Sequence, residues 1–141
     1  MSQGMNDLSK VFVFKILATV GFWCFPLILL PPVALETLGF PKQESYIFVR
    51  LLGWAYLSLC VGYYHGLLAS LDNRRSIGPI HVGIVSNGGA SALLLWYGFH
   101  DAWSSWGAFA RLVMWSSAAV TALITVGLYI HGVRGKLPRA A

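Results

Sequence analysis

Four long apolar stretches, separated by short polar breaks, dominate the chain. They cover approximately residues 11–30, 46–71, 79–99 and 107–131. Each has about the 20 residues that a helix needs to cross the ~30 Å hydrocarbon core of a bilayer. Pro31 and Pro32 end the first stretch, and the polar breaks 72–75 and 100–105 follow the second and the third. The pattern therefore predicts four transmembrane helices.

Composition supports the same interpretation. The 141 residues are 57% hydrophobic and 11% charged, with a mean hydropathy of +0.66, whereas soluble domains carry about 25% charged residues. Four spans use most of the chain and leave only short tails and connections. We therefore expect an all-α polytopic membrane protein, a four-transmembrane-helix bundle, in which residues 1–141 form a single membrane domain without an extramembrane domain.

The basic residues predict the orientation of the spans. Seven of the ten lie on the side of the two tails and the second connection: Lys10, Lys15, Arg74, Arg75, Arg134, Lys136 and Arg139. By the positive-inside rule we expect both termini in the cytoplasm, with the inner membrane of a bacterium as the location. Because the basic residues are divided among short membrane flanks and form no continuous face, we expect no nucleic-acid partner.

Small residues recur every fourth position in three of the predicted helices. The sets are Ser58, Gly62, Gly66 and Ser70 in the second helix, Gly83, Asn87 and Ser91 in the third, and Ser117, Thr121 and Thr125 in the fourth. Small residues let helix backbones approach closely in lipid. They favour packing within the bundle, and as an alternative a self-association face around Gly62 and Gly66.

Three histidines fall at one predicted level of the bundle. At ~1.5 Å per residue, His65, His81 and His131 all lie near the cytoplasmic boundary. Imidazole is a common ligand for iron, copper and zinc, so these residues are candidate ligands of a haem or another metal cofactor. The alternative is that they are interfacial residues that hydrogen-bond to lipid headgroups or to helix ends.

Two arginines lie just inside the opposite boundary. Arg50 and Arg111 are about four residues from their predicted helix starts, and an unpaired guanidinium is costly there. They would form a charge layer with the carboxylates Glu36, Glu44 and Asp101. Alternatively, one of them holds an anionic group, such as a haem propionate or a substrate carboxylate, through its two-pronged guanidinium.

A polar and flexible segment interrupts the third apolar stretch. Asn87, Gly88 and Gly89 lie close to the predicted middle of the membrane, where an asparagine needs a partner and glycines weaken a helix. They are candidates for a substrate path with a locally open backbone. The alternative is an interhelical hydrogen bond beside closely packed glycines.

The two cysteines are predicted to lie apart. Helical rise places Cys24 and Cys60 at depths that differ by about 10 Å, too far for a disulfide. The chain has no Cys-x-x-Cys pair, glycine-rich phosphate loop or hydrolase triad.

These observations leave three hypotheses. The first is a small non-catalytic membrane protein that works as a homo-oligomer or as an accessory subunit of a larger membrane complex. The second is a haem- or metal-binding membrane enzyme that acts on an apolar small molecule. The third is a small-solute transporter or channel that uses Asn87. The sequence does not decide whether the protein is an enzyme.

Overall fold

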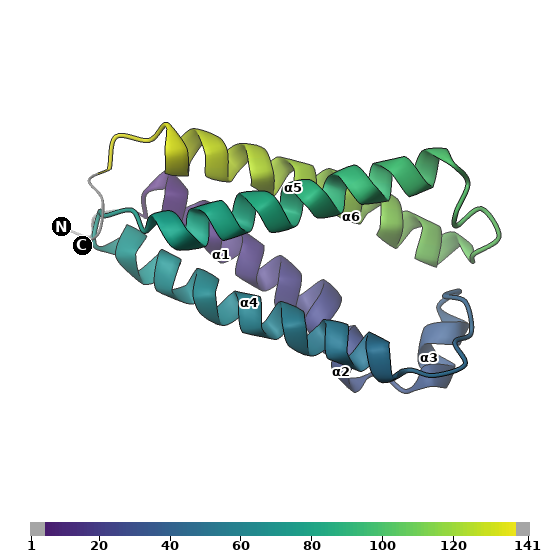
Figure 1. Ribbon diagram of the computed structural model, residues 1–141. Coiled ribbons are helices and arrows are strands. Elements are labelled where there is room, and N and C mark those ends of the chain that lie inside the picture. Colours follow the sequence, from purple (N-terminus) through teal and green to yellow (C-terminus); the bar gives the residue numbers. More distant parts are fainter. Residues whose placement is uncertain (1–4, 138–141) are drawn as a thin grey trace.

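The computed structural model describes residues 5–137, which are helical apart from short connections (Figure 1). The elements are α1 (Asp7–Thr19), the π-helical turn η1 (Val20–Cys24), α2 (Phe25–Leu29), α3 (Pro32–Thr37), α4 (Ile47–Leu71), α5 (Ile77–Phe99), α6 (Ala108–Gly127) and the π-helical turn η2 (Leu128–Val133). Four helical runs are long and apolar enough to cross a membrane: Asp7–Leu29, Ile47–Leu71, Ile77–Phe99 and Ala108–Val133. The predicted all-α, four-span architecture is confirmed.

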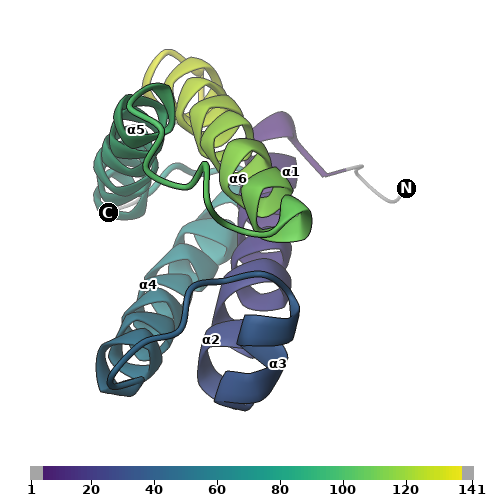
Figure 2. The same ribbon diagram turned by 90° about the vertical axis from the view of Figure 1, so that its right-hand side faces the viewer.

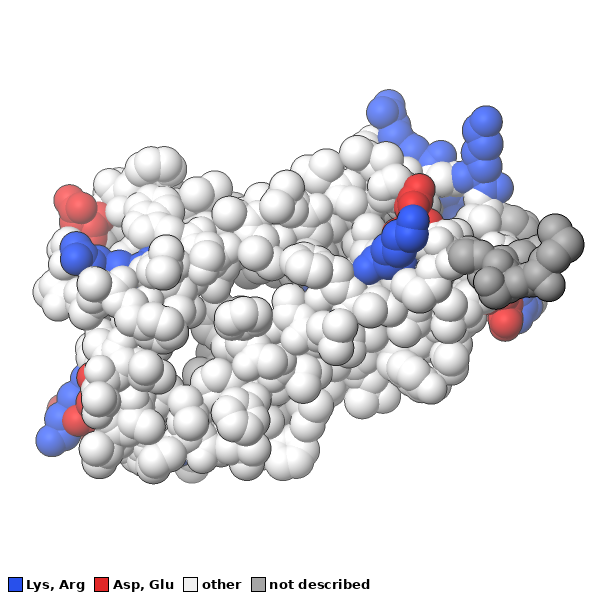
Figure 3. All heavy atoms as spheres, turned by 180° about the vertical axis from the view of Figure 1, so that it is seen from behind, with Lys and Arg blue, Asp and Glu red and all other residues white. Residues whose placement is uncertain are grey.

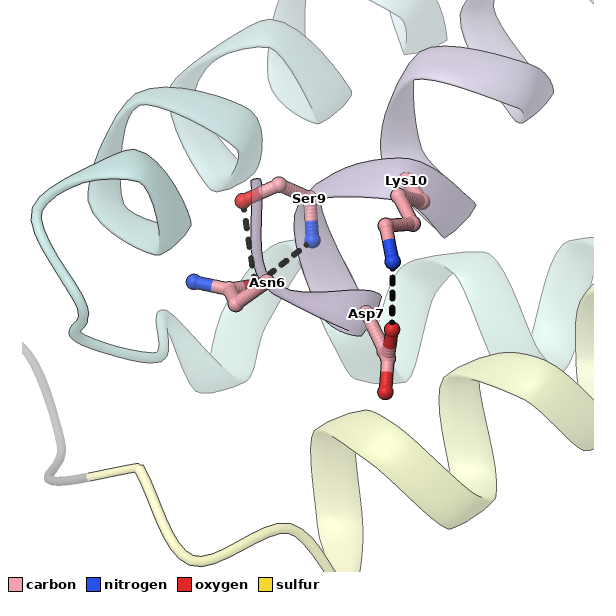
Figure 4. Close-up of polar contacts among 4 residues, drawn as sticks. All are labelled: Asn6, Asp7, Ser9 and Lys10. Carbon is pink, nitrogen blue, oxygen red and sulfur yellow. Dashed lines mark hydrogen bonds and ion pairs between the residues drawn. The ribbon is translucent and has the colours of Figure 1, made fainter. Parts of the chain in front are cut away.

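The first span begins at Asp7, four residues before the predicted start, because Asn6 caps it. The Asn6 side chain accepts a hydrogen bond from the backbone N–H of Ser9 (2.9 Å) and another from its hydroxyl (3.0 Å), as Figure 4 shows. The cap satisfies an N–H that the first turn leaves without a helical partner. Lys10 pairs with Asp7 (2.9 Å) in the same turn.

The first span changes from α-helix to π-helix just before a proline near its C-terminal end. Pro26 has no N–H to donate, and its ring crowds the carbonyl of Phe22 four residues earlier. The helix passes through the π-helical turn η1 just before this point, which is a common way to accommodate such a clash. Pro31 then ends α2 and Pro32 opens the short helix α3, which the sequence analysis did not predict.

The four spans form two antiparallel hairpins. The first hairpin runs from Asp7 to Leu71, and the second from Ile77 to Val133. We call the end that carries residues 5–8, 72–76 and 134–137 the terminal end, and the opposite end the α3 end. The first and the last described residues, Met5 and Leu137, both lie at the terminal end (Figure 1).

Near the terminal end, the hairpins share one apolar core. Its buried residues come from all four spans: Leu8, Phe12, Tyr63, Ile80, Ile124 and Leu128. Glycines bring the helices close together here. A Cβ atom on Gly66 would meet Phe12 at 2.7 Å and Pro79 at 2.8 Å, so the bare backbone of α4 provides the space into which its neighbours pack.

Toward the α3 end the two hairpins diverge (Figures 1 and 2). The elements α1, η1 and α2 of the first span pack on α4, and α5 packs along α6, so each hairpin stays closed. The space-filling view in Figure 3 shows a hollow between the hairpins in this half of the molecule, with charged side chains gathered at the two ends. We call this hollow the inter-hairpin gap.

A contact between two loops closes the inter-hairpin gap at the α3 end. The N–H of Gly107 donates to the carbonyl of Gly39 (2.9 Å), and the rings of Phe40 and Trp106 lie 6.0 Å apart. Gly39 has φ +88°, and a Cβ atom there would lie 2.6 Å from Cα of Gly107. Only glycine fits this approach without strain. The hairpins are therefore joined at both ends and separated between them.

Candidate functional site

A lysine is buried inside the first span. Lys15 lies on the same face of α1 as the core residues Leu8 and Phe12, and only 3% of its surface is exposed. It is eight residues from Asp7, which places it about 12 Å along the span. Its Nζ lies 4.0 Å from the centre of the Tyr63 ring, an arrangement in which the negative face of the ring attracts the ammonium.

Tyr63 connects the lysine to the second hairpin. Its hydroxyl and that of Ser86 are hydrogen-bonded at 2.8 Å. Gly83, one turn earlier in α5, leaves room for the Tyr63 ring and for Leu128. The pair Lys15 and Tyr63 belongs to the first hairpin, while Ser86 belongs to the second, so Tyr63 bridges the two through a polar contact inside the bilayer.

The side-chain nitrogen of Asn87 donates hydrogen bonds within its own helix. Its Nδ2 donates to the carbonyl of Gly83 (2.6 Å) and to the hydroxyl of Ser86 (3.3 Å). Gly88 faces Thr125 of α6, and nothing lies within 4 Å of a Cβ atom placed on Gly89. The structure brings Asn87 to the polar group around Tyr63 but keeps α5 helical through all three positions. A substrate path at this point stays a prediction.

Within residues 5–137, no Asp or Glu side chain forms an ion pair with Lys15. The chain has five acidic residues, of which Asp7 pairs with Lys10 and Asp72 with Arg74. The other three, Glu36, Glu44 and Asp101, belong to the connections at the α3 end. Sequence analysis missed this site because it considered Lys15 only as one of the basic residues that predict the orientation of the spans. The available signal was its helical spacing from Leu8 and Phe12, which puts it on the buried face.

The cysteines lie closer together than helical rise predicted. The thiols of Cys24 and Cys60 interact, and the Cys60 side chain also lies close enough to Lys15 to interact with it. The depth estimate was wrong because it aligned the helix ends. In the structure Gly53 packs against Ile28, so the first turns of α4 extend past α2. Both thiols are free and buried.

The two candidate arginines differ in their surroundings. Arg50 donates to the carbonyl oxygens of Leu27 (2.7 Å) and Leu30 (2.5 Å), and thereby caps the C-terminal end of α2. Arg111 is exposed, and within residues 5–137 its side chain has no hydrogen bond or ion pair. The structure does not bring the two together with Glu36, Glu44 or Asp101 in ion pairs. An anion site at either arginine stays a prediction.

Glu36 has a different partner. It accepts a hydrogen bond from the hydroxyl of Tyr46 (2.9 Å). Desolvation and this hydrogen bond both raise the pKa of the Tyr46 phenol. The contact ties α3 to the residue before α4, so it stabilises the loop at the α3 end.

The three candidate histidines are spread over the surface of the terminal half. His65 and His81 are exposed, and His131 is half-buried beside Asp7. Among the residues that the structure describes, no three His, Cys, Asp or Glu side chains are placed to hold a metal ion. The structure therefore does not bring His65, His81 and His131 together as one ligand set. A haem or metal cofactor, and an enzyme that would use it, stay predictions.

A third arginine has a role that the sequence analysis did not foresee. Nη1 of Arg75 donates to the carbonyl oxygens of Gly132 (3.1 Å), Val133 (2.7 Å) and Gly135 (3.0 Å). These carbonyls lie at the C-terminal end of the last span, where the helix dipole favours a cation. Arg75 thus links the connection between the hairpins to the end of η2.

Comparison with protein-family models, with curated proteins and with solved structures found no match to this chain.

Proposed function

We propose that this integral membrane protein is non-catalytic and works in association with other chains, as a homo-oligomer or as an accessory subunit of a larger membrane complex. The observation that carries the proposal is the open face of α4 around Gly62. Within residues 5–137, a Cβ atom placed on Gly62 would meet nothing within 4 Å beyond the neighbouring backbone of its own helix, and Ser58, one turn away, is also exposed. A second helix can approach the backbone closely there.

Ser58, Gly62, Gly66 and Ser70 form a stripe of small residues along α4. This small-residue stripe belongs to two different surfaces of the helix. Gly66 is covered by Phe12 and Pro79, and the Ser70 hydroxyl bonds to that of Ser9 (2.9 Å). Ser58 and Gly62 face outward instead. The stripe divides because each four-residue step turns an α-helix about 40° past a full turn. Half of it therefore packs inside the molecule, and the other half is free for a partner.

The test is a pair of glycine substitutions in native membranes. Gly62→Leu fills the open face of α4, whereas Gly89→Leu fills an equally open position on α5. Because neither side chain meets the rest of the molecule, both variants should fold. We expect Gly62→Leu to reduce assembly at least tenfold and Gly89→Leu to leave it unchanged, as measured by blue native electrophoresis and by cross-linking through Ser58→Cys in a background without Cys24 and Cys60.

The cross-linked product separates the two forms of the proposal. A species of twice the 15.4 kDa chain mass indicates a homo-oligomer. A product that contains a different protein, identified by mass spectrometry and lost in Gly62→Leu, indicates an accessory subunit. A 15.4 kDa monomer in membranes and in mild detergent, with no cross-link from Ser58→Cys, would refute both.

We also propose that the terminal end faces the cytoplasm of a bacterium, with the protein in the inner membrane. The support is the distribution of Lys and Arg, including Arg74 and Arg75 in the connection between the hairpins. A fluorescent protein fused after Ala141 should fold and fluoresce, while alkaline phosphatase at the same position should be inactive. The reverse result would invert the orientation.

A further inference from the structure

The amine of Lys15 is a buried cationic group without a counter-ion. Burial inside a membrane costs a charged lysine several kcal/mol unless something compensates for its charge. The Tyr63 ring supplies part of that compensation through its 4.0 Å contact. Since the five carboxylates of the chain lie in the connections or at the end of α1, none of them can supply the rest.

The amine is not sealed inside the protein. Within residues 5–137, two side-chain nitrogens are fully covered and without a hydrogen bond, Arg75 Nε and Trp103 Nε1. The Lys15 amine also has no hydrogen-bond acceptor in this part of the chain, but it is not among the fully covered atoms. It therefore keeps a small accessible area.

The Lys15 amine lies close to the half of the molecule that contains the inter-hairpin gap. Tyr63 belongs to the core that joins the hairpins, and Cys60 lies one turn of α4 closer to the α3 end. The Lys15 amine lies 4.0 Å from the centre of the Tyr63 ring. Lys15 follows the core residue Phe12 by three residues toward the α3 end, so its amine lies at the edge of the shared core, next to the half of the molecule in which the inter-hairpin gap opens (Figure 3).

We propose that Lys15 binds the carboxylate of a lipophilic weak acid, such as a long-chain fatty acid, whose apolar tail occupies the inter-hairpin gap. An anion is the ligand that a buried amine binds most strongly in a low-dielectric site. Lys15 lies about 12 Å along the span from Asp7, within the apolar stretch, whereas phospholipid headgroups stay at the bilayer surface. An acid with a hydrocarbon tail can carry its polar group to this depth, because it enters in the neutral form.

The proton balance of binding is simple. The neutral acid gives its proton to the neutral amine, so that an ammonium and a carboxylate face each other and no charge enters from water. Where the amine is already protonated, the acid releases its proton to the aqueous phase and the anion binds. In both cases the pair is neutral, and the Tyr63 ring holds the ammonium on the side away from the ligand.

The experiment uses the full chain in nanodiscs of zwitterionic phosphatidylcholine. The probe is cis-parinaric acid, a fluorescent long-chain carboxylic acid, whose binding is followed by energy transfer from the tryptophans. Its methyl ester, which keeps the tail and lacks the acid, is the ligand control. We expect the wild-type protein to bind the acid at least tenfold more tightly than the ester, and palmitic acid to displace it.

The variant Lys15→Met removes the amine and retains an unbranched apolar side chain. It should fold at least as well as the wild type, because it deletes a buried charge, and it should bind acid and ester equally weakly. Lys10→Met is the matched control: Lys10 lies on the same helix, but its side chain is 63% exposed and it pairs with Asp7. This variant should bind the acid as the wild type does.

Three results would overturn the proposal: equal binding of acid and ester by the wild type, unchanged acid binding by Lys15→Met, or displacement of the probe by phosphatidylglycerol as effective as by palmitic acid. The last would assign the site to anionic lipid headgroups. None of these outcomes depends on assembly, since the Gly62→Leu variant should bind the acid normally whether or not it assembles.

Discussion

The two halves of this protein hold their helices together in different ways. In the terminal half, side chains from all four spans interlock around Phe12 and Tyr63. In the α3 half, the hairpins separate and meet again only through the loops at Gly39 and Gly107. In lipid, helices do not associate to escape water, so close packing decides where they stay together. One half therefore holds the two hairpins together, and the other half leaves a hollow between them.

The largest expected difference in the free energy of unfolding is between alanine substitutions of two phenylalanines in the first span, one in the shared core and one facing lipid. Phe12→Ala leaves a cavity in the shared core, while Phe22→Ala trims a side chain that is 73% exposed toward lipid. We expect Phe12→Ala to lower the free energy of unfolding by about 3 kcal/mol, and Phe22→Ala to change it by less than about 0.5 kcal/mol. Titration with SDS in mild detergent measures both, and similar losses would show that the shared core is not the stabilising region.

Substitutions of the neighbouring residues Arg74 and Arg75 should give the next largest difference in the free energy of unfolding. Arg75→Gln removes the cation that three carbonyls at the end of the last span share, and we expect a loss of about 2 kcal/mol. Arg74→Gln removes an exposed pair with Asp72 at 3.5 Å and should cost at most about 0.5 kcal/mol. The same unfolding titration applies. Equal effects would mean that Arg75 does not secure the terminal end.

The smallest effect on stability concerns the contact at the α3 end. Gly39→Ala introduces a methyl group at φ +88°, against Gly107, and should cost about 1 to 2 kcal/mol. We expect the two loops to separate, which spin labels at Gln43 and Ser104 would report as a longer distance. Gly21→Ala, at a helical position with open space around it, is the control. An unchanged distance in Gly39→Ala would show that the contact is not needed to close the gap.

The sequence predicted the spans well because length, hydropathy and flanking polar residues are local properties. The four apolar stretches correspond to the four helical runs, and Pro79 lies in the first turn of α5, where its missing N–H costs nothing. The helix α3 was not predicted, since six residues after a Pro-Pro pair carry too little periodic signal. The start at Asp7 depended on the Asn6 cap rather than on hydropathy.

The candidate site was harder to predict, because it depends on the rotation and relative height of the helices. Depths counted from the helix ends placed Cys24 and Cys60 about 10 Å apart. In the structure α4 extends past α2, which brings the two residues close together. The burial of Lys15 likewise follows from which face of α1 meets α4. Arg50 was expected to pair with carboxylates or to hold an anionic group, and no contact was predicted for Arg75, whereas both arginines donate hydrogen bonds to backbone carbonyls. Amino-acid composition does not indicate which arginines will donate hydrogen bonds to backbone carbonyls.

The contact between Lys15 and Tyr63 has a consequence for biosynthesis. Both residues belong to the first hairpin, so their contact can form before α5 and α6 have been synthesised. A lysine that faces lipid alone makes a span expensive to insert. Because the aromatic ring belongs to the next span to be synthesised, it can shield the lysine charge as soon as α4 has been made. The first two spans can thus enter the bilayer as a unit, and the later pair docks onto a surface that is already prepared.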